Sequence, residues 1–205
     1  MIVVYGGTFD PVHIGHLRLA FEALEELQAE QLRFLPCHIP PHRPRPLAEA
    51  ELRAQWLETA ISGVARFALD CREMVRPEPS YSIVTLRELR CELGPSTPLV
   101  WLIGEDALGG LPDWHESAAL WEYCHFAVLR RPTTEDRGAL QQRYADRLCA
   151  AHALRHTQAG RIAWLDNTLL DVSASAIRAR TARGLSARFL VPDAILSAVD
   201  TQANS

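Results

Sequence analysis

Short apolar runs alternate with segments of helical apolar spacing along most of the chain. The first run, residues 2–5, has the length and β-branched content of a buried strand. Apolar residues then recur at helical spacing from Ile14 to Leu27. The same alternation predicts later strands at 31–36, 66–70, 99–103, 126–129 and 162–165, and helices at 49–61, 81–93, 116–123, 138–154, 175–182 and 193–199.

This strand–helix order predicts an α/β fold with a doubly wound, mostly parallel sheet and helices on both faces. In open sheets of this kind, ligands bind beyond the carboxyl ends of the strands, near the point where the strand order reverses. A chain of 205 residues can bury a sizeable core as one domain, so we expect residues 1–205 to form a single domain.

Composition narrows the class of protein. Hydrophobic residues make up 48% of the chain and charged residues 22%, as in ordinary globular proteins. The net charge of −4 argues against a general binder of nucleic acid or of membrane surfaces. There is no apolar run of membrane-spanning length and no signal pattern at the N-terminus. The five cysteines, with no C-x-x-C, favour free thiols, so we expect a cytoplasmic protein; the oligomeric state stays open.

The turn between the first strand and the first helix has the features of a phosphate site. Gly6 and Gly7 let the backbone approach a ligand closely, and the helix start offers unpaired N–H groups and a positive dipole end. His13 and His16 lie on one face of the first helical turn, where both would donate to the same anion. The alternative interpretations are a simple turn for the glycines, and half of a metal site or two capping residues for the histidines. The spacing disfavours the loops G-x-G-x-x-G and G-x-x-x-x-G-K-[ST].

A proline-rich loop at 36–46 follows the second predicted strand. It carries His38, His42, Arg43 and Arg45. Its prolines restrict the backbone to extended conformations, so the loop loses little conformational entropy when it becomes ordered. It is either a solvated connector or a cationic loop that neutralises the β- and γ-phosphates of a nucleotide.

A second candidate anion site lies near the end of the chain, in V-S-A-S-A-I-R at 172–178. Ser173 and Ser175 precede a helical run and are cap residues, and Arg178 follows within one helical turn of them. An arginine there is well placed to meet an anion held by the helix start. Two phosphate-directed helix starts fit a triphosphate better than a single phosphate.

Beyond the predicted strand at 99–103, two side chains have the chemistry to bind the ribose and the ring of a nucleotide. Asp106 is a candidate acceptor for ribose hydroxyls. Trp114, in a Pro-Asp-Trp-His loop, offers an aromatic face on which a flat ring would stack, with added cation–π attraction for a pyridinium. Core packing is the other interpretation of Trp114.

These motifs resemble those of the nucleotidyltransferase superfamily. The stretch G-G-T-F-D-P-V-H-I-G-H-L is similar to its [H/T]-x-G-H signature in the wording of bacterial nicotinate-nucleotide adenylyltransferases, and residues 172–178 resemble the second signature, I-S-S-T-x-I-R. The resemblance covers almost the whole chain and is weakest over 133–160. It implies a Rossmann-like fold that transfers AMP from ATP to nicotinate mononucleotide, releasing pyrophosphate in NAD biosynthesis. We expect Mg²⁺ to arrive with ATP, because no carboxylate cage for a protein-held metal is evident.

The resemblance implies a catalytic role for four residues. His13 and His16 would steady the charge that develops on the α-phosphate during direct attack. Arg43 and Arg178 would hold the leaving pyrophosphate, with Arg43 standing where the family usually has lysine. The implied ATP-binding residues are Gly6, Gly7, Thr8, Phe9, His16, Gly104, Asp106, Ser173, Ser175, Ile177 and Arg178.

For the second substrate, the resemblance rests on S-Y-S-I-V-T-L and G-E-D-A-L-G-G-L-P-D-W-H. Trp114 would stack on the nicotinate ring, and backbone amides near Thr85 and His115 would read its carboxylate; Asp106 completes this set. The chain departs from the family pattern at Val84, where an aspartate is usual, and at Ala174, where a hydroxyl is usual.

Three other functions stay open at this point. One is a related adenylyl- or cytidylyltransferase, for example one acting on nicotinamide mononucleotide. Another is a nucleotide sensor without turnover, which the departures at 43, 84 and 174 allow. The last is a metal enzyme using His13, His16, His38 and His42.

Overall fold

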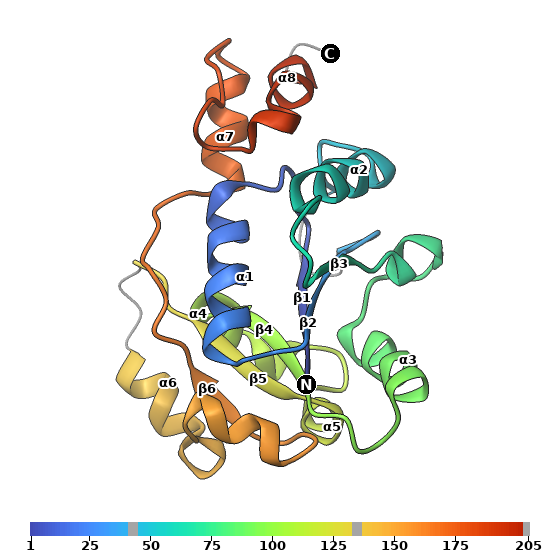
Figure 1. Cartoon of the computed structure of the whole chain (residues 1–205), viewed down its shortest axis with the longest axis vertical. Helices are drawn as coiled ribbons and strands as arrows, with labels where there is room; N and C mark the ends of the chain where they lie inside the picture. Colours follow the sequence, from blue (N-terminus) through green and yellow to red (C-terminus); the bar gives the residue numbers. More distant parts are fainter. Residues whose placement is uncertain (41–44, 133–136, 203–205) are drawn as a thin grey trace.

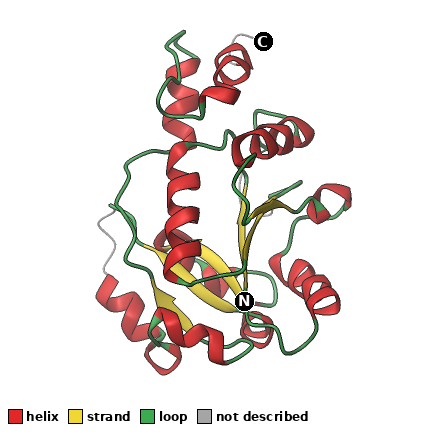
Figure 2. Cartoon of the chain, viewed as in Figure 1, coloured by secondary structure: helices red, strands yellow, loops and turns green. Residues whose placement is uncertain are grey.

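A six-stranded sheet organises the computed structural model of the chain, which describes residues 1–40, 45–132 and 137–202 (Figures 1 and 2). The strand order is β3-β2-β1-β4-β5-β6, and every neighbouring pair is parallel. The order reverses between β1 and β4, because the chain builds outward on one side of β1 and then returns to its other side. The strands are β1 (Ile2–Gly7), β2 (Gln31–Pro36), β3 (Phe67–Leu69), β4 (Leu99–Gly104), β5 (His125–Leu129) and β6 (Ile162–Trp164).

Helices cover both faces of this sheet, as the sequence predicts (Figure 2). Side chains of β1 alternate between the faces: Val3 and Tyr5 join one core, whereas Ile2 and Val4 join the other. The first core contains buried residues of α1, α2 and α8, and the second those of α3, α5 and α6. The helices are α1 (Ile14–Glu26), α2 (Ala50–Ile61), α3 (Ser82–Leu93), α4 (Glu105–Gly109), α5 (Ser117–Tyr123), α6 (Arg137–Arg143), α7 (Ala174–Thr181) and α8 (Asp193–Gln202), with 3₁₀ turns η1 (Arg72–Val75), η2 (Leu111–Asp113), η3 (Ala145–Arg147) and η4 (Ala151–His156).

The predicted long helix at 138–154 is wrong. Helix α6 ends at Arg143, and two 3₁₀ turns follow it. Between those turns, Leu148 forms a parallel bridge with Ile162 of β6, and the Cys149 amide donates to the Ile162 carbonyl at 2.9 Å. Pairing with the edge strand therefore replaces the helix, a tertiary effect that apolar spacing does not encode.

The last part of the chain returns to the start of α1. Figure 1 shows α7 above the first turn of α1, reached by a long extended segment that runs beside α1. The Ile14 amide donates to the Leu190 carbonyl at 2.9 Å, and Arg178 Nη1 donates to the Asp10 carbonyl at 2.6 Å. The two candidate anion sites therefore meet at one edge of the sheet. Over the described residues, no helix has the length and apolarity needed to cross a membrane.

Candidate active site

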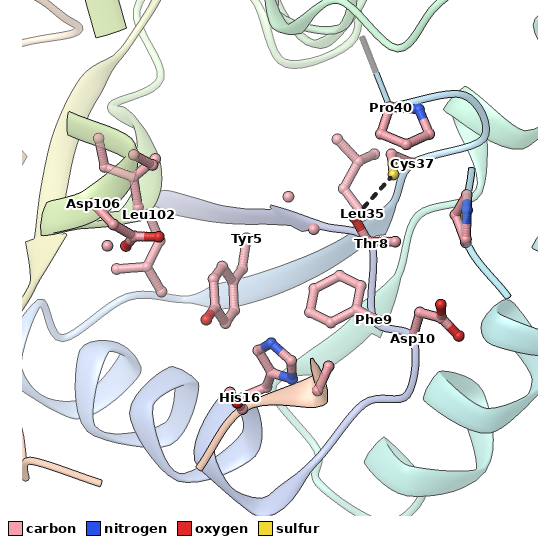
Figure 3. Close-up of a pocket in the computed structure, with 18 of the residues that line it drawn as sticks. Tyr5, Thr8, Phe9, Asp10, His16, Leu35, Cys37, Pro40, Leu102 and Asp106 are labelled. Carbon is pink, nitrogen blue, oxygen red and sulfur yellow. Dashed lines mark hydrogen bonds between the residues drawn. The ribbon is translucent and has the colours of Figure 1, made fainter. Parts of the chain in front are cut away.

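A cavity of about 980 Å³ opens at the carboxyl ends of β1 and β4, where the strand order reverses (Figure 3). Its position agrees with the rule for ligand sites in open α/β sheets, and its volume suits a nucleotide-sized ligand. Figure 3 places Asp106 on one side of Tyr5 and the Thr8–Phe9 turn on the other. His16 lies beside the rings of Tyr5 and Phe9. The predicted residues on its wall are Gly6, Gly7, Thr8, Phe9, His13, His16, Gly104, Asp106, Trp114, His115, Ser173, Ser175 and Arg178.

His13 and His16 hold one another in place through a reciprocal cap at the start of α1. His13 Nδ1 accepts from the His16 amide, and His16 Nδ1 accepts from the His13 amide, both at 3.3 Å. The two rings stack with their centroids 3.6 Å apart. Because each Nδ1 accepts a hydrogen bond, the proton of each ring lies on Nε2, which is a donor. The reciprocal cap therefore fixes the orientation of both rings at the cavity wall.

The surrounding packing fixes these rings. Phe9 and Tyr5 approach His16 edge-on, with centroids 5.1 Å and 6.1 Å from its ring. A Cβ at Gly15 would lie 3.0 Å from His13 Nδ1, so glycine there gives the ring room. Donors held this way need little reorganisation when charge develops on a ligand.

We predict that His13 makes the protein less stable in acid. Burial, with a smaller contribution from the Arg131 charge, lowers the pKa of His13 from its ordinary 6.5 to about 4. Between these values the unfolded chain binds a proton that the folded protein does not, so stability falls as pH drops from about 6.5 towards 4. We expect His13 to lower the free energy of unfolding by about 2 kcal/mol between pH 7.5 and pH 5. Urea denaturation at the two pH values measures this loss.

His13→Asn is the matched variant, because asparagine keeps an acceptor for the helix cap. Burial also lowers the pKa of His125 in both proteins, so only the difference between their pH dependences reports on His13. An unchanged pH dependence in the variant would contradict the prediction.

The second helix start presents hydroxyls and one arginine to the cavity. Ser173 caps α7 by accepting from the Ala176 amide at 3.2 Å, and its Oγ lies 3.1 Å from that of Ser175. Arg178 lines the cavity while one of its nitrogens is held by the Asp10 carbonyl. The prediction that Ile177 lines the cavity is wrong, because its side chain is buried in the first core.

Thr85 is also placed differently from the prediction. It is fully buried, its amide donates to the Tyr81 carbonyl within α3, and its hydroxyl donates to Glu73 at 2.6 Å. Since both polar groups are engaged, Thr85 does not face the cavity. Ser80, Tyr81 and Ser82 line the cavity there instead, and the Tyr81 ring contacts that of His115.

Trp114 both packs against the core and offers a surface to the cavity, the two roles between which the sequence did not decide. It is partly buried against the second core and also lines the cavity. Tyr81 and His115 lie nearby with ring centroids 4.4 Å apart, giving an aromatic wall. Val84, the departure on α3, packs against the core away from this wall.

Sequence reasoning missed a cation at the cavity, Arg131. It follows β5 by two residues, at the same sheet edge as Gly104, and its Nε lies 3.9 Å from Asp106 Oδ1. The sequence signal that could have identified Arg131 is a cationic side chain close behind a predicted strand. Asp106, the candidate ribose acceptor, therefore carries a positive neighbour.

The proline-rich loop is only partly visible. Arg43 and His42 lie outside the described residues, whereas Arg45 lines the cavity. His38 Nδ1 lies 2.9 Å from the Arg76 carbonyl and is not on the cavity wall with His13 and His16. Within the described ranges, no three His, Cys, Asp or Glu side chains cluster closely enough to hold a metal ion.

Comparison with known proteins places these features in a family. The cytidylyltransferase-like family model matches residues 4–180. A probable nicotinate-nucleotide adenylyltransferase of Pseudomonas paraeruginosa is 45% identical over 201 residues, covering 97% of this chain and 94% of the relative. One from Methylococcus capsulatus is 41% identical, covering 99% and 98%. The solved nicotinic acid mononucleotide adenylyltransferase of Plasmodium falciparum, complexed with NaAD, has a similar fold, with a TM-score of 0.73 at 14% identity over 96% and 95% of the chains.

Proposed function

Because the chain belongs to the nicotinate-nucleotide adenylyltransferases of the cytidylyltransferase-like family, we propose that its cavity aligns ATP with nicotinate mononucleotide for direct transfer of AMP. The enzyme makes nicotinate adenine dinucleotide and pyrophosphate in NAD biosynthesis. The observation that carries the residue roles is the meeting of two helix starts, from opposite ends of the chain, at one cavity.

The first part of the proposal concerns the triphosphate. Phosphoryl transfer needs alignment and neutralisation of charge more than acid–base chemistry. The Nε2 donors of His13 and His16 would contact the α-phosphate and stabilise its charge as the nucleotide phosphate attacks. Arg178, with the Ser173 and Ser175 hydroxyls, would hold the departing pyrophosphate, and Arg43 would join from the proline-rich loop.

The second part concerns the pyridine nucleotide. The exposed side of Trp114 would stack on the nicotinate ring, with Tyr81 and His115 closing the wall. The backbone amides of Ser82 and His115 would read the carboxylate, because the amides of Ser80, Tyr81 and Thr85 already donate to the carbonyls of Ile39, Pro79 and Tyr81. Asp106 would accept from ribose hydroxyls.

We propose that ATP enters as its Mg²⁺ complex. Two of the cavity carboxylates have other partners: Asp10 accepts from the Leu47 and Ala48 amides at 2.8 and 3.3 Å, and Asp106 lies beside Arg131. Mg²⁺ keeps several waters and binds phosphate oxygens readily, so the nucleotide itself would hold the ion and the ion would offset phosphate charge. A cytoplasmic location agrees with the free state of all five cysteines.

We expect ATP and nicotinate mononucleotide to give stoichiometric pyrophosphate and nicotinate adenine dinucleotide, and CTP to give neither at a comparable rate. The measurement is steady-state pyrophosphate release with product identified by chromatography, for ATP or CTP paired with the nicotinate or nicotinamide mononucleotide. Faster turnover of the amide would move the assignment to the nicotinamide substrate. Binding of ATP without pyrophosphate release under any pairing would indicate a sensor.

A further inference from the structure

A buried arginine without an acidic partner lies behind the phosphate turn. Arg53 of α2 is 1% exposed, and in the described part of the chain no carboxylate lies within 4.0 Å of its nitrogens. Each of its three nitrogens donates to a backbone carbonyl. Nη1 donates to Thr8 O at 2.6 Å, Nη2 to Cys37 O at 2.8 Å and to His38 O at 3.4 Å, and Nε to Ala48 O at 3.2 Å.

Carbonyl dipoles satisfy these donors but do not cancel the charge. A buried cation is disfavoured unless a counter-charge compensates it, and arginine stays protonated in proteins. Asp10 and Glu73, two carboxylates of the cavity wall, accept hydrogen bonds from groups other than Arg53: Asp10 from the Leu47 and Ala48 amides, and Glu73 from the Thr85 hydroxyl. In the described part of the free protein, the Arg53 charge therefore lies behind the cavity wall without an ion-pair partner.

The carbonyls that Arg53 binds belong to segments that form the wall. Thr8 and Cys37 line the cavity and lie side by side, joined by a Cys37 Sγ to Thr8 Oγ1 contact of 3.8 Å (Figure 3). Because a peptide unit is planar and trans, a Thr8 carbonyl turned towards Arg53 turns the Phe9 N–H the opposite way. No described residue accepts a hydrogen bond from that Phe9 amide. Arg53 thus orients a backbone donor as well as adding charge.

We propose that Arg53 is a positioning residue for the nucleotide, whose polyphosphate supplies a counter-charge where the described residues provide no ion pair. This inference rests on the proposed function and deepens it. Arg53 touches no substrate atom. It acts through the Thr8–Phe9 peptide and the backbone at 37–38, and through its charge, which favours a polyanion at the adjoining wall.

Arg90 provides the matched control. It also binds only carbonyls, those of Tyr123, Gly94, Thr97 and Gln158, and makes no ion pair within the described ranges. Its partners precede β4, β5 and β6, at the opposite edge of the sheet from the cavity. Removing Arg90 should cost stability in the same way as removing Arg53, without affecting a polyanion site.

The experiment compares Arg53→Met with Arg90→Met in two measurements. The first is the rise in melting temperature that inorganic tripolyphosphate produces in each protein, which does not depend on turnover. The second is kcat and KM for ATP. We expect Arg53→Met to lose most of the tripolyphosphate-induced shift and to raise the KM for ATP about tenfold or more, with a smaller change in kcat. Arg90→Met should keep the wild-type shift and KM.

A second pair of variants keeps the test decisive if Arg53→Met does not fold. Arg53→Lys keeps the charge but not the fork, so its KM for ATP should rise about threefold and its tripolyphosphate shift should lie between wild type and no shift. Arg90→Lys should match wild type. Equal behaviour of the Arg53 and Arg90 variants in both measurements overturns the proposal. Absence of pyrophosphate release by the wild-type enzyme would overturn the proposed function alone, because the tripolyphosphate shifts would still test Arg53.

Discussion

His16→Ala is expected to lower kcat by on the order of 10²-fold or more, the scale of losing one oriented electrostatic donor at a reacting centre. His16 is held in position by the His13 cap and by the Phe9 and Tyr5 rings, so its ring is already oriented at the cavity wall. The loss should fall mainly on kcat, because the charge on the α-phosphate grows only as the reaction proceeds. Steady-state pyrophosphate release with both substrates measures it.

The alanine variant also removes the acceptor for the His13 amide, and this structural effect needs its own control. His16→Asn restores an oxygen acceptor near the position of Nδ1 but places no donor where Nε2 lies. We expect the asparagine variant to regain thermal stability and to stay as inactive as the alanine variant. Turnover close to wild type in either variant would remove His16 from the catalytic role.

Arg178→Met is expected to lower kcat/KM for ATP by on the order of 10²-fold, since it removes a charge-assisted donor aimed at the departing pyrophosphate. The structure holds one of its nitrogens on the Asp10 carbonyl, which fixes the guanidinium at the cavity. Arg178→Lys should recover only part of the activity, because a point charge replaces a two-pronged fork.

Arg180 gives a control from the same helix. It is exposed, it donates to the Ser186 carbonyl at 2.6 Å, and it is absent from the cavity wall. Arg180→Met should therefore change kcat/KM by less than about twofold. If the two methionine variants behaved alike, the assignment of Arg178 to the pyrophosphate would fail.

The spacing of apolar residues along the chain predicted most of the strands and helices. A strand buried on both faces reads as an unbroken apolar run, and the helices that cover it show a 3.6-residue period, so element type followed from spacing. The exception is 138–154, where the Leu148 bridge to Ile162 interrupts the helix. That pairing joins residues close to an edge strand, and propensity along the chain carries no record of it.

The residues of the site also fall into those that the sequence revealed and those that only the fold revealed. The glycines, His13 and His16, the capping serines and Trp114 belong to contiguous motifs, so their chemistry was visible in the sequence. Thr85 and Ile177 were assigned to the site by motif, but the direction of a side chain depends on what packs around its helix. Arg131 and Arg53 belong to no motif, and only the folded chain places Arg131 on the cavity wall and Arg53 behind it.

The sequence by itself determined the α/β alternation, the family, and the two segments with anion-binding chemistry, because each depends on residues within a few positions of one another. Only the tertiary structure decided that these segments share one cavity, how the two histidine rings are oriented, and that Arg53 lies behind the wall without an ion pair in the described part of the chain. The physical reason is that burial and hydrogen-bond partners are properties of the packed chain. The contact between Arg178 and Asp10 joins positions 168 residues apart, and no local pattern specifies it.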